Sequence, residues 1–458
     1  MKILYIENRY QTHFWEEIAR RLEGDGHDIH WIVQSHAFRP KIGSVNVIPY
    51  PRNADLGNFE TSKTYLARVA GKDRNINYFL GNSAHYRHYD ERIVEILQRT
   101  RPDVVFGEST EFHELMAIEH CRALNIPYLQ PTTTRYPSGR FAFYEYDTQE
   151  PFAGSGERLS DQAVDEIVDA IVGRSVLPDY MVKVQTPSRF NALSQKLRNR
   201  WILTTAYFSG ERFNTPHPIH KVGLQRELAN NLRRWEKLAG QRAPRADRFT
   251  LLYPLQMQPE ANIDVWGNEH RCQATLLQRM LKGTDAQTQI LVKGNPKAKY
   301  EMSDALLRII ESSDRLIPLP LATPMAKVFA SASLIATVTG TVAIEATLAG
   351  RPVVTFANVP WTSNPGCMRL SSPDKIASAI EMVRSGAFPR NSADDSRKYI
   401  QWVVATSYQG LTTASFHNPR SADPVNLQRV HAGFAHVLHA IKEQKKQDFL
   451  STVHSVGS

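Results

Sequence analysis

Short apolar runs alternate with helical patterns in two separate stretches of the chain, and this alternation constrains the fold more than any other feature. The first stretch contains the runs KILYIE (2–7), IHWIVQ (29–34), VNVIPY (45–50) and DVVF (103–106), with helical patterns at 12–22 and 111–124. The second contains FTLLYPLQ (249–256), QILVK (289–293), LIPLP (316–320), LIATV (334–338) and PVVTF (352–356). Such alternation predicts parallel strands joined by right-handed crossovers. We therefore expect an α/β fold with two Rossmann-like domains.

The region between the two stretches is helical and charged. It runs from Asp161 to Leu238, with Ser160 as the expected N-cap of its first helix, and GQRAPRADR (240–248) resembles a linker. A chain of 458 residues is too long for one ordinary hydrophobic core. We expect a first domain over 1–240 that includes the helical insertion, a second over 249–420, and a C-terminal helix and tail over 421–458. This helix could pack back across the joint between the domains.

Composition excludes several protein classes. Hydrophobic residues make up 42% and charged residues 22% of the chain, as in soluble globular proteins. No apolar run approaches the roughly 20 residues of a spanning helix, and the start MKILYIENRY resembles no signal peptide. We expect a cytoplasmic protein. The three cysteines, Cys121, Cys272 and Cys367, are far apart and in no metal-ligand spacing, so we expect reduced thiols and no metal site.

The formal charge of +9 is concentrated in one segment. Residues 188–248 contain 13 Lys or Arg against 4 Asp or Glu, interleaved with Trp201, Tyr207, Phe208 and Trp235. The basic side chains considered for an anionic acceptor are Arg198, Arg200, Arg233 and Arg234. One interpretation is a solvated helical face. The other is a surface for an anionic glycan or a phospholipid membrane, while the lack of any nucleic-acid-binding motif argues against DNA or RNA.

Polar clusters follow the strands of the second stretch. The segment QMQPEANID delivers Gln256, Gln258, Glu260 and Asp264 directly after an apolar run. In open parallel sheets, ligands lie beyond the carboxyl ends of the strands, so this cluster is a candidate for a site. The next strand ends in LVKGNPK, where Lys293 could meet a phosphate, Asn295 could hydrogen-bond a ligand and Pro296 ends the strand. Gly-Asn-Pro is equally good turn chemistry.

The segment VTGTVAIEATLAG places a turn between a strand and a helix. Thr339, Gly340 and Thr341 would put hydroxyls and free backbone N–H groups at the helix start, and Glu345 lies one turn further along. This pattern indicates a phosphate cradle with a carboxylate for a ribose. The chain contains neither GxGxxG nor GxxxxGK[ST], which argues against a dinucleotide coenzyme and an ATP P-loop. The phosphate would then belong to a nucleotide-activated substrate.

Three motifs, YPLQMQPEA, VKGNP and VTGTVAIEATLAGRPVVTF, occur in an order and spacing that resembles the capsule polysaccharide biosynthesis family, which includes the bacterial β-Kdo glycosyltransferases. The resemblance covers residues 251–361. It implies a glycosyltransferase-B-like fold with two Rossmann-like domains facing a central cleft, and a CMP-activated sugar donor bound by the second domain. It also implies an acceptor on the first domain, no cofactor or metal, and retention of anomeric configuration. The histidine of the family's Lys-x-His-Pro motif is replaced by Asn295, which cannot carry a proton near neutral pH.

Retention by double displacement requires a carboxylate nucleophile and a second group for the acceptor proton. Glu260 or Asp264 could be the nucleophile, with Glu260 preferred because it occupies the family motif. Glu108, at the end of DVVFGES, is the candidate acid/base, and Glu7 and His13 are the alternatives.

The sequence is compatible with three functions. The first is a glycosyltransferase that moves Kdo or a related ulosonic acid to a bacterial surface glycan, free or lipid-linked, possibly at the inner membrane surface. The second is a nucleotide-sugar epimerase or isomerase. The third is a non-catalytic protein of capsule assembly, which the replacement at Asn295 motivates.

Overall fold

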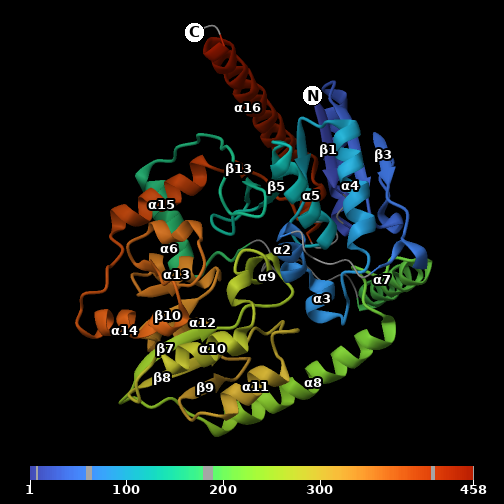
Figure 1. Cartoon of the computed structure of the whole chain (residues 1–458). Coiled ribbons are helices and arrows are strands. Elements are labelled where there is room, and N and C mark those ends of the chain that lie inside the picture. Colours follow the sequence, from blue (N-terminus) through green and yellow to red (C-terminus); the bar gives the residue numbers. More distant parts are fainter. Residues whose placement is uncertain (7–8, 58–63, 179–188, 414–417, 457–458) are drawn as a thin grey trace.

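The structure is a computed structural model that describes residues 1–6, 9–57, 64–178, 189–413 and 418–456, and it contains two α/β domains (Figure 1). The first domain has a seven-stranded sheet in the order β13-β6-β5-β4-β1-β2-β3. Its strands are β1 (Lys2–Ile6), β2 (Asp28–Val33), β3 (Ser44–Val47), β4 (Val104–Phe106), β5 (Tyr128–Thr133), β6 (Arg140–Glu145) and β13 (Tyr408–Gln409). The five strands β1 to β5 are parallel, whereas β6 and β13 extend the sheet in antiparallel pairings.

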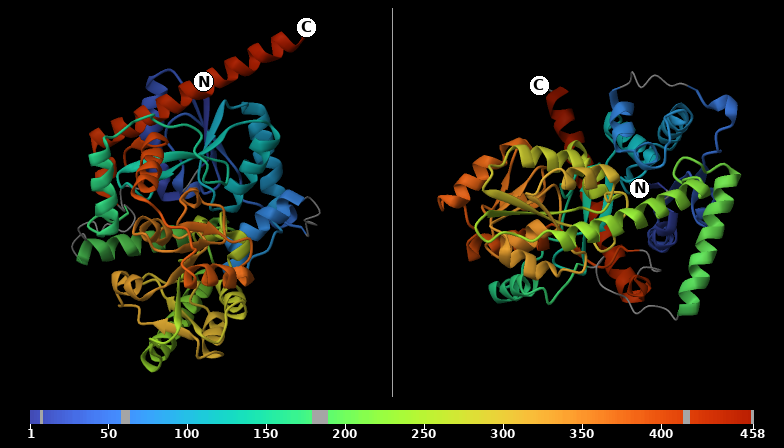
Figure 2. Two further views of the ribbon diagram at one scale, coloured as in Figure 1. Left: turned by 90° about the vertical axis from the view of Figure 1, so that its left-hand side faces the viewer. Right: turned by 90° about the horizontal axis from the view of Figure 1, so that it is seen from below.

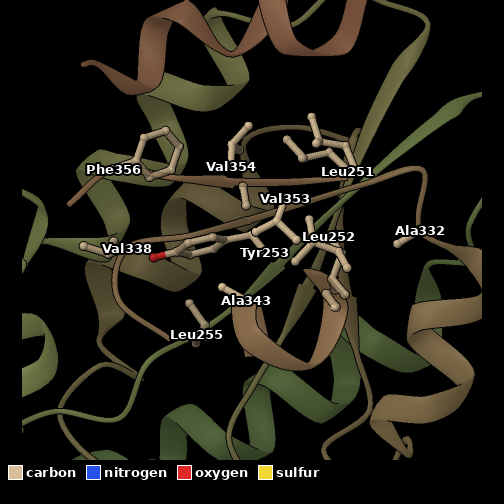
Figure 3. Packing of buried hydrophobic residues seen from close by; sticks show 14 of the residues in the cluster. Leu251, Leu252, Tyr253, Leu255, Ala332, Val338, Ala343, Val353, Val354 and Phe356 are labelled. Carbon is tan, nitrogen blue, oxygen red and sulfur yellow. The ribbon is translucent and has the colours of Figure 1, made fainter. Parts of the chain in front are cut away.

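The second domain has a six-stranded, fully parallel sheet in the order β12-β11-β10-β7-β8-β9. Its strands are β7 (Phe249–Pro254), β8 (Thr288–Lys293), β9 (Leu316–Leu319), β10 (Leu334–Thr337), β11 (Val353–Thr355) and β12 (Cys367–Arg369). Leu251, Leu252 and Tyr253 of β7 are fully buried and pack near Val353 and Val354 (Figure 3). Continuous apolar strands of this kind are covered by helices on both faces, as expected for a parallel sheet.

Helices cover both sheets (Figures 1 and 2). Those of the first half are α1 (Thr12–Gly24), α2 (Thr64–Lys72), α3 (Arg74–Tyr78), α4 (Tyr86–Thr100), α5 (Phe112–Ala123), α6 (Asp161–Val172), α7 (Arg189–Ser209) and α8 (Pro218–Gln241). Those of the second half are α9 (Ala261–Asp264), α10 (Gln273–Lys282), α11 (Asp304–Glu311), α12 (Met325–Ser331), α13 (Val342–Leu348), α14 (Ile376–Arg384), α15 (Ala393–Ala405) and α16 (Pro424–Val456). In the part of the chain described, none of the helices combines the length and apolarity needed to cross a bilayer.

The expectation of two Rossmann-like domains in a glycosyltransferase-B-like arrangement is confirmed by these sheets. Both sheets follow the Rossmann strand order, running outwards in both directions from the first strand of each domain. In the first domain the order reverses between β1 and β4, and in the second between β7 and β10. A site is expected at each reversal, beyond the carboxyl ends of the two strands.

Three helices from the middle and the end of the chain pack on cores formed mainly by distant segments. Helix α6, which Ser160 caps as expected by accepting from the Ala163 N–H at 3.3 Å, buries Val164 and Ile171 in the core of the second domain. Helix α8 buries Trp235 in the same core, where its indole N–H donates to the Leu319 carbonyl at 2.9 Å. In the other direction, α16 adds Phe434 to the core of the first domain. The apolar face of each helix determines which domain it packs on, because that face is stabilised only where a hydrophobic core covers it.

Candidate functional site

A cavity of about 360 Å³ lies between the two domains at the reversal point of the first sheet. It is lined by Arg9, Tyr10, Gln11, Lys72, Arg74, Glu108, Thr110, Glu111, Pro259, Glu260, Ala261, Asp264 and Val265. The lining residues of the first domain follow β1 and β4 or lie where α2 ends and α3 begins, and those from 259 follow β7 of the second domain. The three carboxylates expected to be catalytic, Glu108, Glu260 and Asp264, therefore line one cavity although they come from opposite domains.

The end of β4 positions Glu108. The preceding residue, Gly107, has no room for a side chain, because a Cβ there would lie 2.7 Å from Cγ2 of Ile6 and would overlap the Tyr128 hydroxyl. That hydroxyl donates to the Glu108 carbonyl at 2.5 Å, which fixes the backbone at the strand end. The Glu108 side chain is half-buried at the cavity wall.

Two guanidinium groups share one carboxylate at the same wall. Nε of Arg9, in the turn η1 (Arg9–Gln11), lies 3.3 Å from Glu111, and Arg74 forms a close ion pair with the same carboxylate. Arg9 also lies 3.5 Å from the buried Glu211. Burial and then the positive charge of Arg9 lower the pKa of Arg74 to about 10, which still leaves the Arg74 guanidinium charged at neutral pH. The first domain thus offers a fixed pair of cations beside Glu108.

Asp264 is held by three hydrogen bonds. Its Oδ1 accepts from the Tyr78 hydroxyl at 2.5 Å and from Nε2 of Gln258 at 2.8 Å, and its Oδ2 accepts from the Glu260 N–H at 2.9 Å. Burial raises the pKa of Asp264, whereas these hydrogen bonds oppose the rise. With both oxygens accepting from protein donors, Asp264 orders the 258–264 loop and joins it to α3 of the first domain.

Glu260 is less tightly held. It precedes α9, and its Oε2 accepts from Nδ2 of Asn262 at 3.3 Å. Burial raises the pKa of Glu260, while the hydrogen bond from Asn262 and the positive charges of Arg135 and Lys299 lower it. A half-buried carboxylate at a cavity wall with one long hydrogen bond can approach a bound substrate. Glu260 is therefore better placed than Asp264 to act on one.

Glu301 is a further buried carboxylate behind this loop. Its Oε2 accepts from the Gln258 N–H at 3.1 Å and the Lys299 N–H at 3.0 Å, whereas Oε1 has no hydrogen-bond partner among the described residues. Burial raises the pKa of Glu301 to about 7, and the negative charge of Glu260 contributes to that rise. Protonation of Glu301 near neutral pH would change the charge behind the 258–264 loop.

Lys293 and its neighbours take part in the fold. Nζ of Lys293 donates to the carbonyls of Gly294 at 2.8 Å and Leu321 at 2.9 Å, and burial lowers its pKa. Oδ1 of Asn295 accepts from the Lys297 N–H at 2.8 Å, as in an Asx turn, and Pro296 is exposed beside it. These three residues do not line the cavity. In the structure, these residues form the turn that ends the strand.

The Thr-Gly-Thr segment lies at the reversal point of the second sheet, where Thr339 and Gln256 join two strand ends. Nε2 of Gln256 donates to Oγ1 of Thr339 at 2.8 Å, and the Thr339 N–H donates back to Oε1 of Gln256 at 3.2 Å. Oγ1 of Thr339 in turn donates to the Asn262 carbonyl at 2.7 Å. The Gly340 N–H donates to Oγ1 of Thr337 at 3.1 Å, and Thr341 is half-buried. The turn forms as predicted, but the hydroxyl and the N–H of Thr339 are already hydrogen-bonded to the segment that carries Gln256 and Asn262.

Glu345 lies in α13, buried between two residues from earlier in the chain. Its Oε1 accepts from the Tyr136 hydroxyl at 3.0 Å, and its Oε2 lies 3.1 Å from Nη1 of Arg174. Burial raises the pKa of Glu345, and the positive charge of Arg174 opposes the rise. In this structure Glu345 ties the first-domain segment at Tyr136 to the second domain.

The other expected residues are spread over the surface. His13 is exposed on α1, with Nδ1 4.0 Å from Glu16, and Glu7 lies outside the described residues. Arg198, Arg200 and Arg233 are exposed. Arg234 differs, because it pairs with Asp304 at 2.7 Å and with Glu311, so its charge is neutralised by the second domain.

Sequence reasoning missed the residues that join the domains. Tyr78 reaches Asp264 and Gln258 and stacks on Tyr300 with ring centroids 5.2 Å apart. Arg135 contacts the Asn262 side chain and lies over the rings of Trp266 and Trp361, 5.4 and 5.5 Å from their centroids. Neither residue belongs to a recognisable motif. Their roles depend on a partner more than 100 positions away in the chain, which periodicity does not reveal.

Comparisons with known proteins give a general likeness to solved structures. The UDP-GlcNAc 2-epimerase of Methanocaldococcus jannaschii has 13% identity and a TM-score of 0.28, with 88% of this chain and 99% of that chain covered. The calicheamicin glycosyltransferase CalG4 has 13% identity and a TM-score of 0.27, with 95% and 98% covered. MurG of Acinetobacter baumannii has 12% identity and a TM-score of 0.25, with 94% and 98% covered. These values are too low to assign a family or a substrate. No protein-family model and no curated protein matches the chain.

Proposed function

We propose that the protein is a retaining glycosyltransferase that moves Kdo or a related ulosonic acid from a CMP-activated donor to a bacterial surface glycan. One observation carries the proposal: Glu108 of the first domain and Glu260 of the second line the same cavity, at the reversal point of the first sheet. Retention by double displacement needs a carboxylate nucleophile for the sugar and a second group for the acceptor proton. Arg9 and Arg74 supply positive charge for an acidic sugar or a phosphate in the same space.

In the proposed reaction, the carboxylate of Glu260 attacks the anomeric carbon and the bond from that carbon to the phosphate oxygen breaks, which releases CMP. The acceptor hydroxyl then attacks the same carbon from the side that CMP has left. Glu108 takes the hydroxyl proton as the bond to Glu260 breaks. Two inversions give net retention. Asp264 is a positioning residue in this scheme, because its two oxygens hold Tyr78, Gln258 and the Glu260 N–H.

The donor-side residues form the second part of the proposal. Asn295, Pro296 and Thr341 are accessible enough to meet a nucleotide directly. Gln258, Lys293, Thr339 and Glu345 are buried and have protein partners, so they would have to exchange those partners when a donor binds. Gly340 keeps its backbone close to Thr337, since a Cβ there would lie 2.6 Å from Oγ1 of that residue.

The experiment is incubation of the purified chain with CMP-Kdo and a synthetic capsule or O-antigen glycan, with CMP release and product mass as readouts. Glu260→Gln should abolish both, whereas Glu269→Gln, an exposed carboxylate in the following segment, should leave both unchanged. In Glu108→Gln, intact-mass measurement should detect a sugar adduct on the chain. Conversion of the donor without an acceptor would support an epimerase instead. Donor binding without turnover, unchanged in Glu260→Gln, would support a non-catalytic role.

The donor base is tested separately by thermal shift. CMP should stabilise the protein more than UMP, UDP or GDP at equal concentration, because stabilisation grows with the ratio of ligand concentration to Kd. Equal shifts from all four nucleotides would contradict a cytosine-specific site.

A further inference from the structure

Helix α7 lies at the outer edge of the molecule, and α8 leads away from its end in a different direction (Figure 2, right). Leu197, Trp201 and Phe208 of α7 are 57%, 71% and 65% exposed. Their spacings of four and seven residues put them on one side of the helix, because an α-helix has about 3.6 residues per turn. Three large apolar side chains thus form one continuous stripe on α7.

The opposite side of α7 faces the first domain. Ala206 is buried there, and α7 packs against η2 (His36–Phe38). At the end of the helix the backbone of Gly210 lies so close to Tyr50 that a Cβ would be 2.9 Å from the Tyr50 Cβ. The fold therefore holds α7 by one face and leaves the apolar stripe turned away from the protein. The start of α8 adds Ile219 and Val222, which are 76% and 46% exposed.

Basic side chains flank this stripe. Arg198 and Arg200 lie on its two sides by helical spacing, both exposed, and neither forms an ion pair with another described residue. Arg212 and Lys221, at the junction of the two helices, are also exposed. Further along the basic segment, Arg234 forms ion pairs within the protein, with Asp304 and Glu311. The unpaired positive charge is thus concentrated beside the apolar side chains of α7 and the start of α8.

We propose that the exposed side of α7, together with the start of α8, docks on the surface of an anionic lipid bilayer. Apolar side chains bordered by unpaired cations are the features of a helix that lies in a membrane interface, where Trp and Phe enter the acyl boundary and Arg meets the phosphate headgroups. These positive charges would repel a second copy of the same basic surface, whereas they would attract anionic lipid headgroups.

The experiment is co-sedimentation of the full chain with vesicles of phosphatidylglycerol and phosphatidylcholine, compared with phosphatidylcholine alone. The chain should bind the anionic vesicles, and salt should weaken binding. The double variant Trp201→Glu, Phe208→Glu should reduce binding at least tenfold. The variant Arg198→Ala, Arg200→Ala should reduce it roughly thirtyfold, as expected for two cations that each contribute about 1 kcal/mol near an anionic surface. The matched control is Leu80→Glu, Val425→Glu, which changes two exposed apolar residues elsewhere and should bind as the parent does.

Equal binding to neutral and anionic vesicles, or full binding by the Trp201→Glu, Phe208→Glu variant, would overturn the proposal. So would light scattering that shows a dimer in the parent chain and a monomer in that variant, because the stripe would then be a self-association face. The test does not depend on sugar transfer. The variant should retain transfer to a soluble acceptor if both proposals hold, so failure of one is distinguishable from failure of the other.

Discussion

The hydroxyl of Tyr78 in the first domain donates a hydrogen bond to Oδ1 of Asp264 in the second, at 2.5 Å. Nε2 of Gln258 lies 2.6 Å from the same hydroxyl, and the Tyr78 ring stacks on Tyr300. One side chain from α3 thus meets the loop that carries Glu260 by both polar and aromatic contacts. The position of that loop relative to the first domain depends on this contact.

Tyr78→Phe should weaken the contact between the domains. The ring and its stacking remain, but Asp264 loses one hydrogen bond, and a hydrogen bond to a charged group contributes about 1.5 to 3 kcal/mol. We expect a decrease of about 2 kcal/mol in the free energy of unfolding of the cooperative unit, measured by urea denaturation. Tyr300→Phe is the control, since it keeps the ring stack and leaves Asp264 untouched. Equal losses in the two variants would show that the hydrogen bond to Asp264 is not the source.

Glu260→Gln and Asp264→Asn should separate activity from stability. Glu260 accepts one long hydrogen bond, so Glu260→Gln should change the free energy of unfolding by less than about 1 kcal/mol while lowering transfer by about 10³-fold or more. In Asp264→Asn, the amide N–H₂ group faces at least one of the donors that now bond to Asp264, so that hydrogen bond is lost. The free energy of unfolding should fall by about 1 to 3 kcal/mol. Parallel denaturation and CMP-release assays would measure both effects. The reverse pattern, a stable and inactive Asp264→Asn, would make Asp264 the nucleophile.

Arg174→Ala should destabilise the protein by leaving Glu345 buried without its cation. Removal of one partner from a fully buried pair costs about 3 to 5 kcal/mol, and because the Arg174 side chain is 23% exposed we expect about 2 kcal/mol. The control is Arg397→Ala, whose pair with Asp165 is 40% and 43% exposed and should therefore lower the free energy of unfolding less than Arg174→Ala does. Adding Glu345→Gln to Arg174→Ala should recover part of the loss. Urea denaturation of all three variants tests this; no recovery in the double variant would contradict an uncompensated charge as the cause.

Glu301 predicts a pH dependence of stability. Burial raises its pKa to about 7 in the folded chain from about 4.5 when unfolded, so the folded state holds the proton more tightly. Its contribution to stability is then fully present below about pH 4.5 and is lost as pH rises through about 7. Glu301→Gln has no such titration. Between pH 5 and pH 8, the free energy of unfolding of this variant should gain about 2 to 3 kcal/mol relative to the parent.

Glu269→Gln, which replaces an exposed carboxylate, serves as the control and should follow the parent at every pH. Denaturant midpoints measured from pH 5 to pH 8 check the prediction. A constant difference between Glu301→Gln and the parent across that range would mean that Glu301 keeps an ordinary pKa in the folded protein.

The sequence by itself determined most of the parallel strands of both sheets and where those strands end, but not the antiparallel β6 and β13. The apolar runs at 103–106, 249–256 and 334–338 became β4, β7 and β10, because continuous apolar segments bounded by turn residues have few other ways to be buried. It also placed Glu108, Glu260 and Asp264 at strand ends, which the topology of a parallel sheet brings to the ligand-binding edge. These are local patterns combined with one general rule of topology.

The tertiary structure decided which of those residues are available for chemistry. Lys293, Thr339 and Glu345 have the residue types of a donor site, yet each is bound by a partner that its own segment does not identify: Leu321, Gln256 and Arg174. The same holds for the helical segment, whose α6 and α8 pack on the second domain while α7 packs on the first. Hydrogen bonds and buried faces between distant segments depend on how the two domains meet, and no periodicity along the chain encodes that geometry. For this reason the sequence could name three carboxylates, whereas only the folded chain shows Asp264 held by Tyr78 and Glu260 at the cavity wall.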